Sequence, residues 1–209
     1  MHHPAHLHLV DKDGNTVLHQ LVQEGTNIEM AELLLEEGAL INAPGAEYRT
    51  ALHLATLNNN LAFAKLLIKH GANIEVSDQH GYSPLIYALL EGHIDMATLL
   101  LEHGAEVNTS NRYSKSPLHL AVKKRLISAA ELLLKYGADP GFVDCHHFTP
   151  LHWAVLDANV DMIELLLKYG ANINAKPHDK TPLDLSRNRE VTAILLKHGA
   201  RSSVELSES

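Results

Sequence analysis

The strongest constraint on this chain is an internal repeat of about 33 residues. A Thr/Ser-x-Leu triplet recurs at spacings of 34, 33, 33, 33 and 32 residues, beginning at Thr16, Thr50, Ser83, Ser116, Thr149 and Thr181. A second marker, Gly-Ala after a leucine-rich run, recurs in step with it at Gly38, Gly71, Gly104, Gly137, Gly170 and Gly199. Two independent markers in phase over six copies predict an array of stacked supersecondary units.

Within one copy, the residue order predicts two short helices. In "TPLHWAVLDANVDMIELLLKYG", Thr149 is a good helix N-cap, and Pro150 suits the first helical position, where its missing N–H costs nothing. Apolar residues follow at helical spacing, pause near Asp157, and resume through the leucine run. Gly170 then ends the second helix, because glycine readily takes the left-handed conformation past a helix C-terminus. Such a pair cannot bury both of its apolar faces alone, so neighbouring copies must stack.

These motifs resemble the ankyrin repeat. The resemblance is carried by "TALHLA" at Thr50, "SPLHLA" at Ser116, "TPLHWA" at Thr149 and "LLLKYGANINA" at Leu165, and it extends over residues 11–201. It implies an all-α fold, an ankyrin-repeat solenoid of stacked helix-turn-helix units with hairpin loops. It also implies a concave groove lined by the hairpins and the first helices.

The repeat boundaries predict one ankyrin-repeat domain over 11–201, with repeats beginning near 11, 45, 78, 111, 144 and 176. The segment "PAHLHLVD" aligns with "GALINAPG" at 38–45, so residues 1–10 are interpreted as the tail of a preceding repeat, and 202–209 as a polar tail. Two repeats depart from the pattern at the helix-1 histidine, where Ile86 and Asp184 stand instead. Asn59, Arg125 and Ala158 occupy the turn position of Gly92, where a left-handed backbone would strain them.

Composition narrows the function classes. A net charge of −8 argues against nucleic-acid binding, which needs a basic surface, and against anionic membranes. The apolar runs are far shorter than a membrane span of ~20 residues. Cys145 is the only cysteine, so no internal disulfide can form and a reducing compartment is expected, the cytoplasm first, with the nucleus or a host cytosol as alternatives.

No catalytic or cofactor motif is present, and we expect no enzyme activity, no cofactor and no metal site. Sixteen histidines invite the idea of a metal, but the resemblance assigns His19, His53, His119 and His152 to bridging neighbouring loops. Cys145, His146 and His147 carry zinc-type donors, yet three adjacent residues rarely close a tetrahedral site. The same adjacency disfavours Cys145 and His146 as a nucleophile and base. The N-terminal cluster His2, His3, His6 and His8 is interpreted as adventitious.

One stretch stands out against the acidic background. "RYSKSPLHLAVKKR", from Arg112 to Arg125, holds five basic residues and no acid. The resemblance implies that partners contact hairpin tips and the exposed side of the first helix, and aromatic and arginine side chains are typical of binding hot spots. The predicted partner-binding residues are Tyr82, Leu90, Arg112, Tyr113, Lys115, Lys123, Lys124, His146, Phe148 and Leu156. Trp153 replaces a helix-1 leucine and is expected to pack rather than to contact a partner.

The sequence therefore predicts a non-enzymatic, monomeric protein–protein interaction module. It would bind an acidic and apolar protein segment through the concave face of repeats 3–5. Two alternatives remain open. The chain could be a targeting module of a larger protein, such as a ubiquitin-ligase adaptor, a signalling scaffold or a bacterial effector, with activity elsewhere. It could also be a structural spacer whose basic patch is simply solvated.

Overall fold

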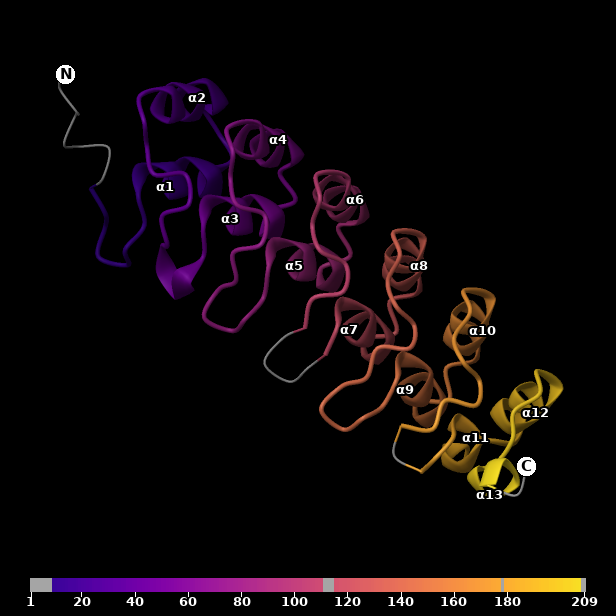
Figure 1. Ribbon diagram of the computed structural model, residues 1–209. Helices are drawn as coiled ribbons and strands as arrows, with labels where there is room; N and C mark the ends of the chain where they lie inside the picture. Colours follow the sequence, from indigo (N-terminus) through magenta and orange to yellow (C-terminus); the bar gives the residue numbers. More distant parts are fainter. Residues whose placement is uncertain (1–8, 111–114, 178, 208–209) are drawn as a thin grey trace. The chain divides into compact units, whose positions relative to one another are not determined.

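The computed structural model describes residues 9–110, 115–177 and 179–207, and within them the regular elements are helices (Figure 1). The chain divides into two compact units, Met1–Glu106 and Val107–Ser209, called here the N-terminal and C-terminal units. Arg112, Tyr113 and the N-terminal histidine cluster lie outside the described residues. None of the helices that the structure describes is long and apolar enough to cross a membrane.

The N-terminal unit stacks three helix pairs. In each pair the first helix belongs to an inner row and the second to an outer row, and each pair packs against the next, α1 on α3, α3 on α5, α2 on α4 and α4 on α6 (Figure 1). A short 3-10 helix, η2, forms part of the hairpin loop before α3. The elements are α1 Val17–Glu24, α2 Ile28–Glu36, η2 Ala46–Tyr48, α3 Ala51–Leu57, α4 Leu61–Lys69, α5 Pro84–Leu90 and α6 Ile94–Glu102.

The C-terminal unit repeats this arrangement and adds one helix. Helix α7 packs on α9, α9 on α11, and α8 on α10, so the all-α stack predicted from the repeat is confirmed in each unit. The prediction of a single domain over 11–201 stays a prediction. The elements are α7 Pro117–Lys123, α8 Ile127–Lys135, α9 Pro150–Leu156, α10 Val160–Lys168, α11 Pro182–Leu185, α12 Arg189–Lys197 and α13 Ser203–Ser207.

Four buried histidines tie consecutive repeats together, as the family resemblance implied. In each, Nδ1 accepts a hydrogen bond from the backbone N–H of the Thr or Ser that caps its own helix. The neutral ring then carries its proton on Nε2, which donates to a carbonyl in the next hairpin. The four bonds run from His19 to Arg49 O (3.1 Å), His53 to Tyr82 O (3.1 Å), His119 to Phe148 O (2.9 Å) and His152 to Lys180 O (3.2 Å).

In repeat 6, Asp184 makes the corresponding connection with the opposite polarity. One of its carboxylate oxygens accepts from the Thr181 amide at 2.8 Å, as the histidine does in other repeats. Its partner on the far side, however, is the start of α13, where the Ser203 amide donates to both Asp184 oxygens at 3.1 and 3.2 Å. A carboxylate suits this position because its partner is a donor rather than a carbonyl. The segment predicted as a plain polar tail therefore contains a helix attached to the last repeat.

The turns between paired helices adopt the strained backbone that the sequence suggested. Asn59, Arg125 and Ala158 have φ values of 51°, 59° and 47°, in the left-handed region that Gly92 occupies at 72°. This conformation costs Arg125 and Ala158 about 1–2 kcal/mol each and costs Asn59 less. Arg125 offsets part of that cost, because its guanidinium donates to Asp157 O at 3.0 Å.

Candidate partner-binding site

Two lysines of the basic stretch lie beside one side chain, Trp153 on α9. The ammonium groups of Lys115 and Lys123 lie 5.5 and 5.7 Å from the centroid of its ring. Both distances fall within the ~6 Å range of cation–π attraction. Lys115 comes from the hairpin before α7 and Lys123 from the last turn of α7, so repeat 4 supplies the charge and repeat 5 the aromatic surface.

Trp153 is held by the hairpin of its own repeat. Phe148 meets the indole edge-on with centroids 5.7 Å apart, and His146 does so at 6.2 Å. Phe148 also stacks flat on His152, at 5.4 Å and 7° between the ring planes. The prediction that Trp153 packs is confirmed by these contacts, but its side chain is only partly buried. Trp153 is thus a fixed aromatic platform beside two cations.

The carboxylate of Asp144 holds the Trp153 indole and the hairpin of repeat 5 in place. Its carboxylate is buried and accepts three hydrogen bonds: from the amides of His146 (2.9 Å) and Phe148 (3.0 Å) and from the Trp153 indole N–H (2.9 Å). Burial by itself would raise the pKa of Asp144, but these hydrogen bonds outweigh it and lower the pKa below its ordinary value. Asp144 therefore stays ionised and fixes the hairpin and the indole in one geometry.

Two further predicted residues of the C-terminal unit, Lys124 and Leu156, lie at the ends of the first helices of repeats 4 and 5. Lys124 is exposed at the end of α7, and Leu156 is 40% exposed at the end of α9. Among the described residues, neither Lys123 nor Lys124 lies within 4.0 Å of a carboxylate. Lys115, Lys123, Trp153, His146 and Phe148 are called the basic–aromatic cluster below.

Tyr82 and Leu90 belong to the N-terminal unit, where a related cluster exists. Tyr82 meets Tyr87 edge-on at 5.7 Å, and Leu90 is only partly exposed at the end of α5. Arg49 lies 5.3 Å from the centroid of the Tyr87 ring and donates to its hydroxyl at 3.1 Å. The Tyr87 hydroxyl in turn donates to the buried Asp78 at 2.6 Å.

The two clusters correspond residue by residue at an offset of 66, which is two repeats. Arg49, Asp78, Tyr82 and Tyr87 match Lys115, Asp144, Phe148 and Trp153. They differ in accessibility: Tyr87 is buried, and Arg49 forms an ion pair of 2.7 Å with Glu47. In the N-terminal copy the cation is paired with Glu47, whereas in the C-terminal copy Lys123 is exposed and the indole is partly exposed. Sequence reasoning missed Trp153 and Asp144 as site residues, although this offset could have identified both.

Cys145, His146 and His147 form the donor-rich tip of the repeat 5 hairpin. Cys145 is exposed at the hairpin tip beside His146 and His147. No group of three or more His, Cys, Asp or Glu side chains in the described part of the chain is arranged to hold a metal ion.

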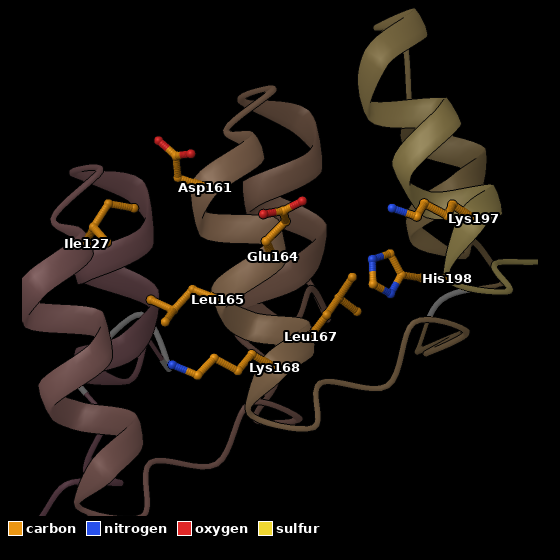
Figure 2. A pocket seen from close by; sticks show the side chains of 8 residues that line it. All are labelled: Ile127, Asp161, Glu164, Leu165, Leu167, Lys168, Lys197 and His198. Carbon is orange, nitrogen blue, oxygen red and sulfur yellow. The ribbon is translucent and has the colours of Figure 1, made fainter.

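A second feature is an open depression of about 650 Å³ on the outer helices of the C-terminal unit. Figure 2 shows its lining side chains, with Ile127 from α8, five residues of α10 in the middle, and Lys197 and His198 beyond. Its charges are mixed, since Asp161 and Glu164 lie among Lys168 and Lys197. Lys168 is also engaged by Glu131 at 3.7 Å. This mixture selects no ligand class, and we assign the depression no role.

Comparisons with known proteins agree with the repeat architecture. A family model described as ankyrin repeats in three copies matches residues 1–78, 18–111, 73–144 and 118–205, which overlap along nearly the whole chain. Among solved structures, the chain is similar to the ankyrin repeat domain of Bcl-3, described as a unique member of the IkappaB protein family. That match has a TM-score of 0.86 and 28% sequence identity, and it covers 91% of this chain and 86% of the other. No curated protein matches the sequence.

Proposed function

The chain belongs to the ankyrin-repeat family, and from this premise we propose that it is a non-enzymatic protein-binding module whose C-terminal unit binds an acidic and apolar protein segment. The family membership supports protein partners in general. The chemistry of the partner and the face that it contacts are inferred from the basic–aromatic cluster. The function resides in such surface residues, because the fold alone is shared by many unrelated binders.

The observation that carries this proposal is the placement of Lys115 and Lys123 beside the partly exposed Trp153. Ammonium groups attract carboxylates over a distance set by the Debye length, ~10 Å at 0.1 M salt, and so speed and orient encounter. A fixed indole offers a large apolar contact at little entropic cost, because Asp144 and Phe148 already hold it. Exposed Leu156 extends the apolar part of the surface.

The partner is inferred to be a protein rather than a nucleic acid. The cluster is local, while the whole chain carries a net charge of −8, which would repel an extended polyanion outside the contact. A short acidic segment with an apolar side chain avoids that repulsion, because it covers only the cluster. A reducing, cytoplasmic setting is part of the proposal and is based on the single, exposed Cys145.

The test is affinity capture from cell lysate with Lys123→Glu/Lys124→Glu compared with the wild-type protein. Both side chains are exposed, so circular dichroism is expected to show unchanged folding. A matched control, Lys65→Glu/Lys197→Glu, makes the same change in net charge at exposed positions on α4 and α12. We expect partners to be lost by the first variant, retained by the control, and released from the wild type as salt is raised. If both variants recover the wild-type partners, the cluster is only a solvated surface and the proposal fails.

A further inference from the structure

The counterpart of the basic–aromatic cluster in the N-terminal unit already holds an anion. There the guanidinium carbon of Arg49 lies 5.3 Å from the centroid of the Tyr87 ring, and a carboxylate oxygen of Glu47 lies 2.7 Å from its Nη2. A carboxylate is thus bound to the cation that lies over the aromatic ring. The N-terminal copy therefore serves as an internal template for a ligand of the C-terminal copy.

The C-terminal copy does not supply this anion from the same position of its own sequence. Glu47 corresponds to Tyr113 two repeats later, and the whole stretch from Arg112 to Arg125 contains no acid. Both copies keep the buried carboxylate, Asp78 in one and Asp144 in the other, so the exposed acid is what differs. An anion at the place of Glu47 would therefore come from a partner.

The C-terminal copy also carries more positive charge. Lys115 takes the place of Arg49, and Lys123 and Lys124 stand where repeat 2 has an uncharged leucine and asparagine. Both of these added lysines are exposed, and neither lies within 4.0 Å of a carboxylate of the described residues. One carboxylate would balance only one of the three charges. A phosphoryl group, which carries about −1.5 to −2 at pH 7, would balance nearly two.

Two of the three ammonium groups lie beside the same ring. Lys115 and Lys123 come from different segments, yet their Nζ atoms are 5.5 and 5.7 Å from the centroid of Trp153. Exposed His146 meets this ring edge-on at 6.2 Å and adds an imidazole that can donate a hydrogen bond. An ammonium group binds phosphate as a point charge with three donors. The cluster thus gathers donors from three segments for a ligand with several acceptor oxygens.

We propose that the basic–aromatic cluster binds a phosphorylated side chain of the partner protein. The phosphoryl oxygens would accept hydrogen bonds from Lys115, Lys123 and His146, and an apolar residue of the same segment would contact Trp153. This inference rests on the proposed function, because it names the anion of the acidic and apolar segment. Phosphorylation of the partner would then switch binding on.

The experiment uses the full chain, immobilised, and three pools of short synthetic peptides with identical random flanks. The central residue is phosphoserine in the first pool, glutamate in the second and serine in the third, and retained peptides are counted by mass spectrometry. We expect the phosphoserine pool to be retained about tenfold more than the glutamate pool, because it adds charge and a third acceptor oxygen. The serine pool should not be retained.

Two variants locate the phosphopeptide. Lys123→Ala changes an exposed side chain, and Lys115→Ala removes the other ammonium group beside Trp153. Each should lower the retention of the phosphoserine pool by about tenfold, the loss of one charge-assisted contact. Lys65→Ala, at an exposed position of α4, is the matched control and should leave retention unchanged. Circular dichroism checks that all three variants are folded.

The outcomes separate this inference from the proposed function. Equal retention of the phosphoserine and glutamate pools, weakened in both cases by Lys123→Ala, would overturn the inference and leave the proposed function standing. If neither pool is retained, or if neither Lys115→Ala nor Lys123→Ala changes retention, both proposals fail. Equal retention of the serine pool would also overturn both, because charge would then play no part.

Discussion

The indole nitrogen of Trp153 donates a 2.9 Å hydrogen bond to Oδ2 of Asp144, nine residues earlier in the same repeat. Two repeats before, the hydroxyl of Tyr87 donates to Oδ2 of Asp78 at 2.6 Å, across the same nine residues. In both places a buried carboxylate accepts two hairpin amides and one aromatic donor. The same arrangement therefore occurs twice in the chain, and in both places the buried carboxylate fixes a hairpin and holds an aromatic ring against the neighbouring repeat.

Trp153→Phe tests the hydrogen bond between the aromatic donor and the buried carboxylate directly. The ring is largely kept but the indole donor is lost, so the buried Asp144 carboxylate loses one of its three hydrogen bonds. We expect the free energy of unfolding, measured by urea denaturation, to fall by about 1–3 kcal/mol. Tyr87→Phe should cost at least as much, since it removes the donor to Asp78 and also the acceptor of the Arg49 guanidinium. A loss below about 0.5 kcal/mol in both variants would show that solvent replaces the missing donor.

The four bridging histidines predict acid sensitivity near neutral pH. Burial lowers the pKa of His19, His53, His119 and His152 below the ordinary 6.5, despite hydrogen bonds that act the other way. Below pH 6.5 the unfolded chain binds protons that the folded chain excludes. The contribution of these neutral histidines to the free energy of unfolding is therefore fully present above pH 6.5. It is lost as the pH falls from 6.5 toward the lowered pKa values of the folded state.

The measurement is the free energy of unfolding between pH 7.5 and 5.5, for the wild type and His119→Gln. Each histidine contributes a slope of at most about 1.4 kcal/mol per pH unit. Glutamine does not titrate, so His119→Gln should reduce the slope by up to that amount. An unchanged slope would mean that His119 binds its proton as readily in the folded chain as in the unfolded one, which contradicts its burial and its donor and acceptor pattern.

Asp184→His is predicted to destabilise repeat 6, although histidine occupies this position in four other repeats. An imidazole that accepts from Thr181 would direct its remaining N–H at the Ser203 amide, and two donors cannot pair. We expect a loss of about 1 kcal/mol or more and faster hydrogen exchange in α13. Asp184→Asn is the informative control, because its amide oxygen can still accept from one backbone N–H. Protection of α13 equal to that of the wild type in Asp184→His would refute the proposed polarity.

Ala158→Gly is predicted to stabilise the protein. At φ 47° the alanine pays about 1–2 kcal/mol that glycine avoids, and glycine loses up to about 1 kcal/mol of that through its greater freedom in the unfolded chain. A net gain of up to about 1 kcal/mol should appear as a higher midpoint in thermal unfolding. Arg125→Gly should gain less or nothing, because it also removes the bond to Asp157 O. Equal gains from both substitutions would mean that this hydrogen bond contributes nothing.

The sequence by itself determined the repeat and the positions of the helix pairs, and its resemblance to the ankyrin repeat implied the role of the first-helix histidines. These features are local and periodic: a Thr or Ser cap, a proline or apolar residue after it and a glycine at the end each act on residues a few positions away. Even the strained turns at Asn59, Arg125 and Ala158 followed from the glycine in the corresponding place. Within the candidate site, Lys115, Lys123, His146 and Phe148 could be chosen because the ankyrin resemblance implies which positions contact partners.

Only the tertiary structure decided how those residues are connected. That Lys115 and Lys123 converge on Trp153 depends on contacts between repeats 4 and 5, which no local pattern specifies. That Asp144 holds the indole depends on how the hairpin of repeat 5 folds against its own first helix. The partner of Asp184, at the start of α13, likewise lies outside what the repeat pattern specifies. Local signals set the conformation of each repeat. Burial and hydrogen-bond partners across repeats exist only once the helix pairs have stacked.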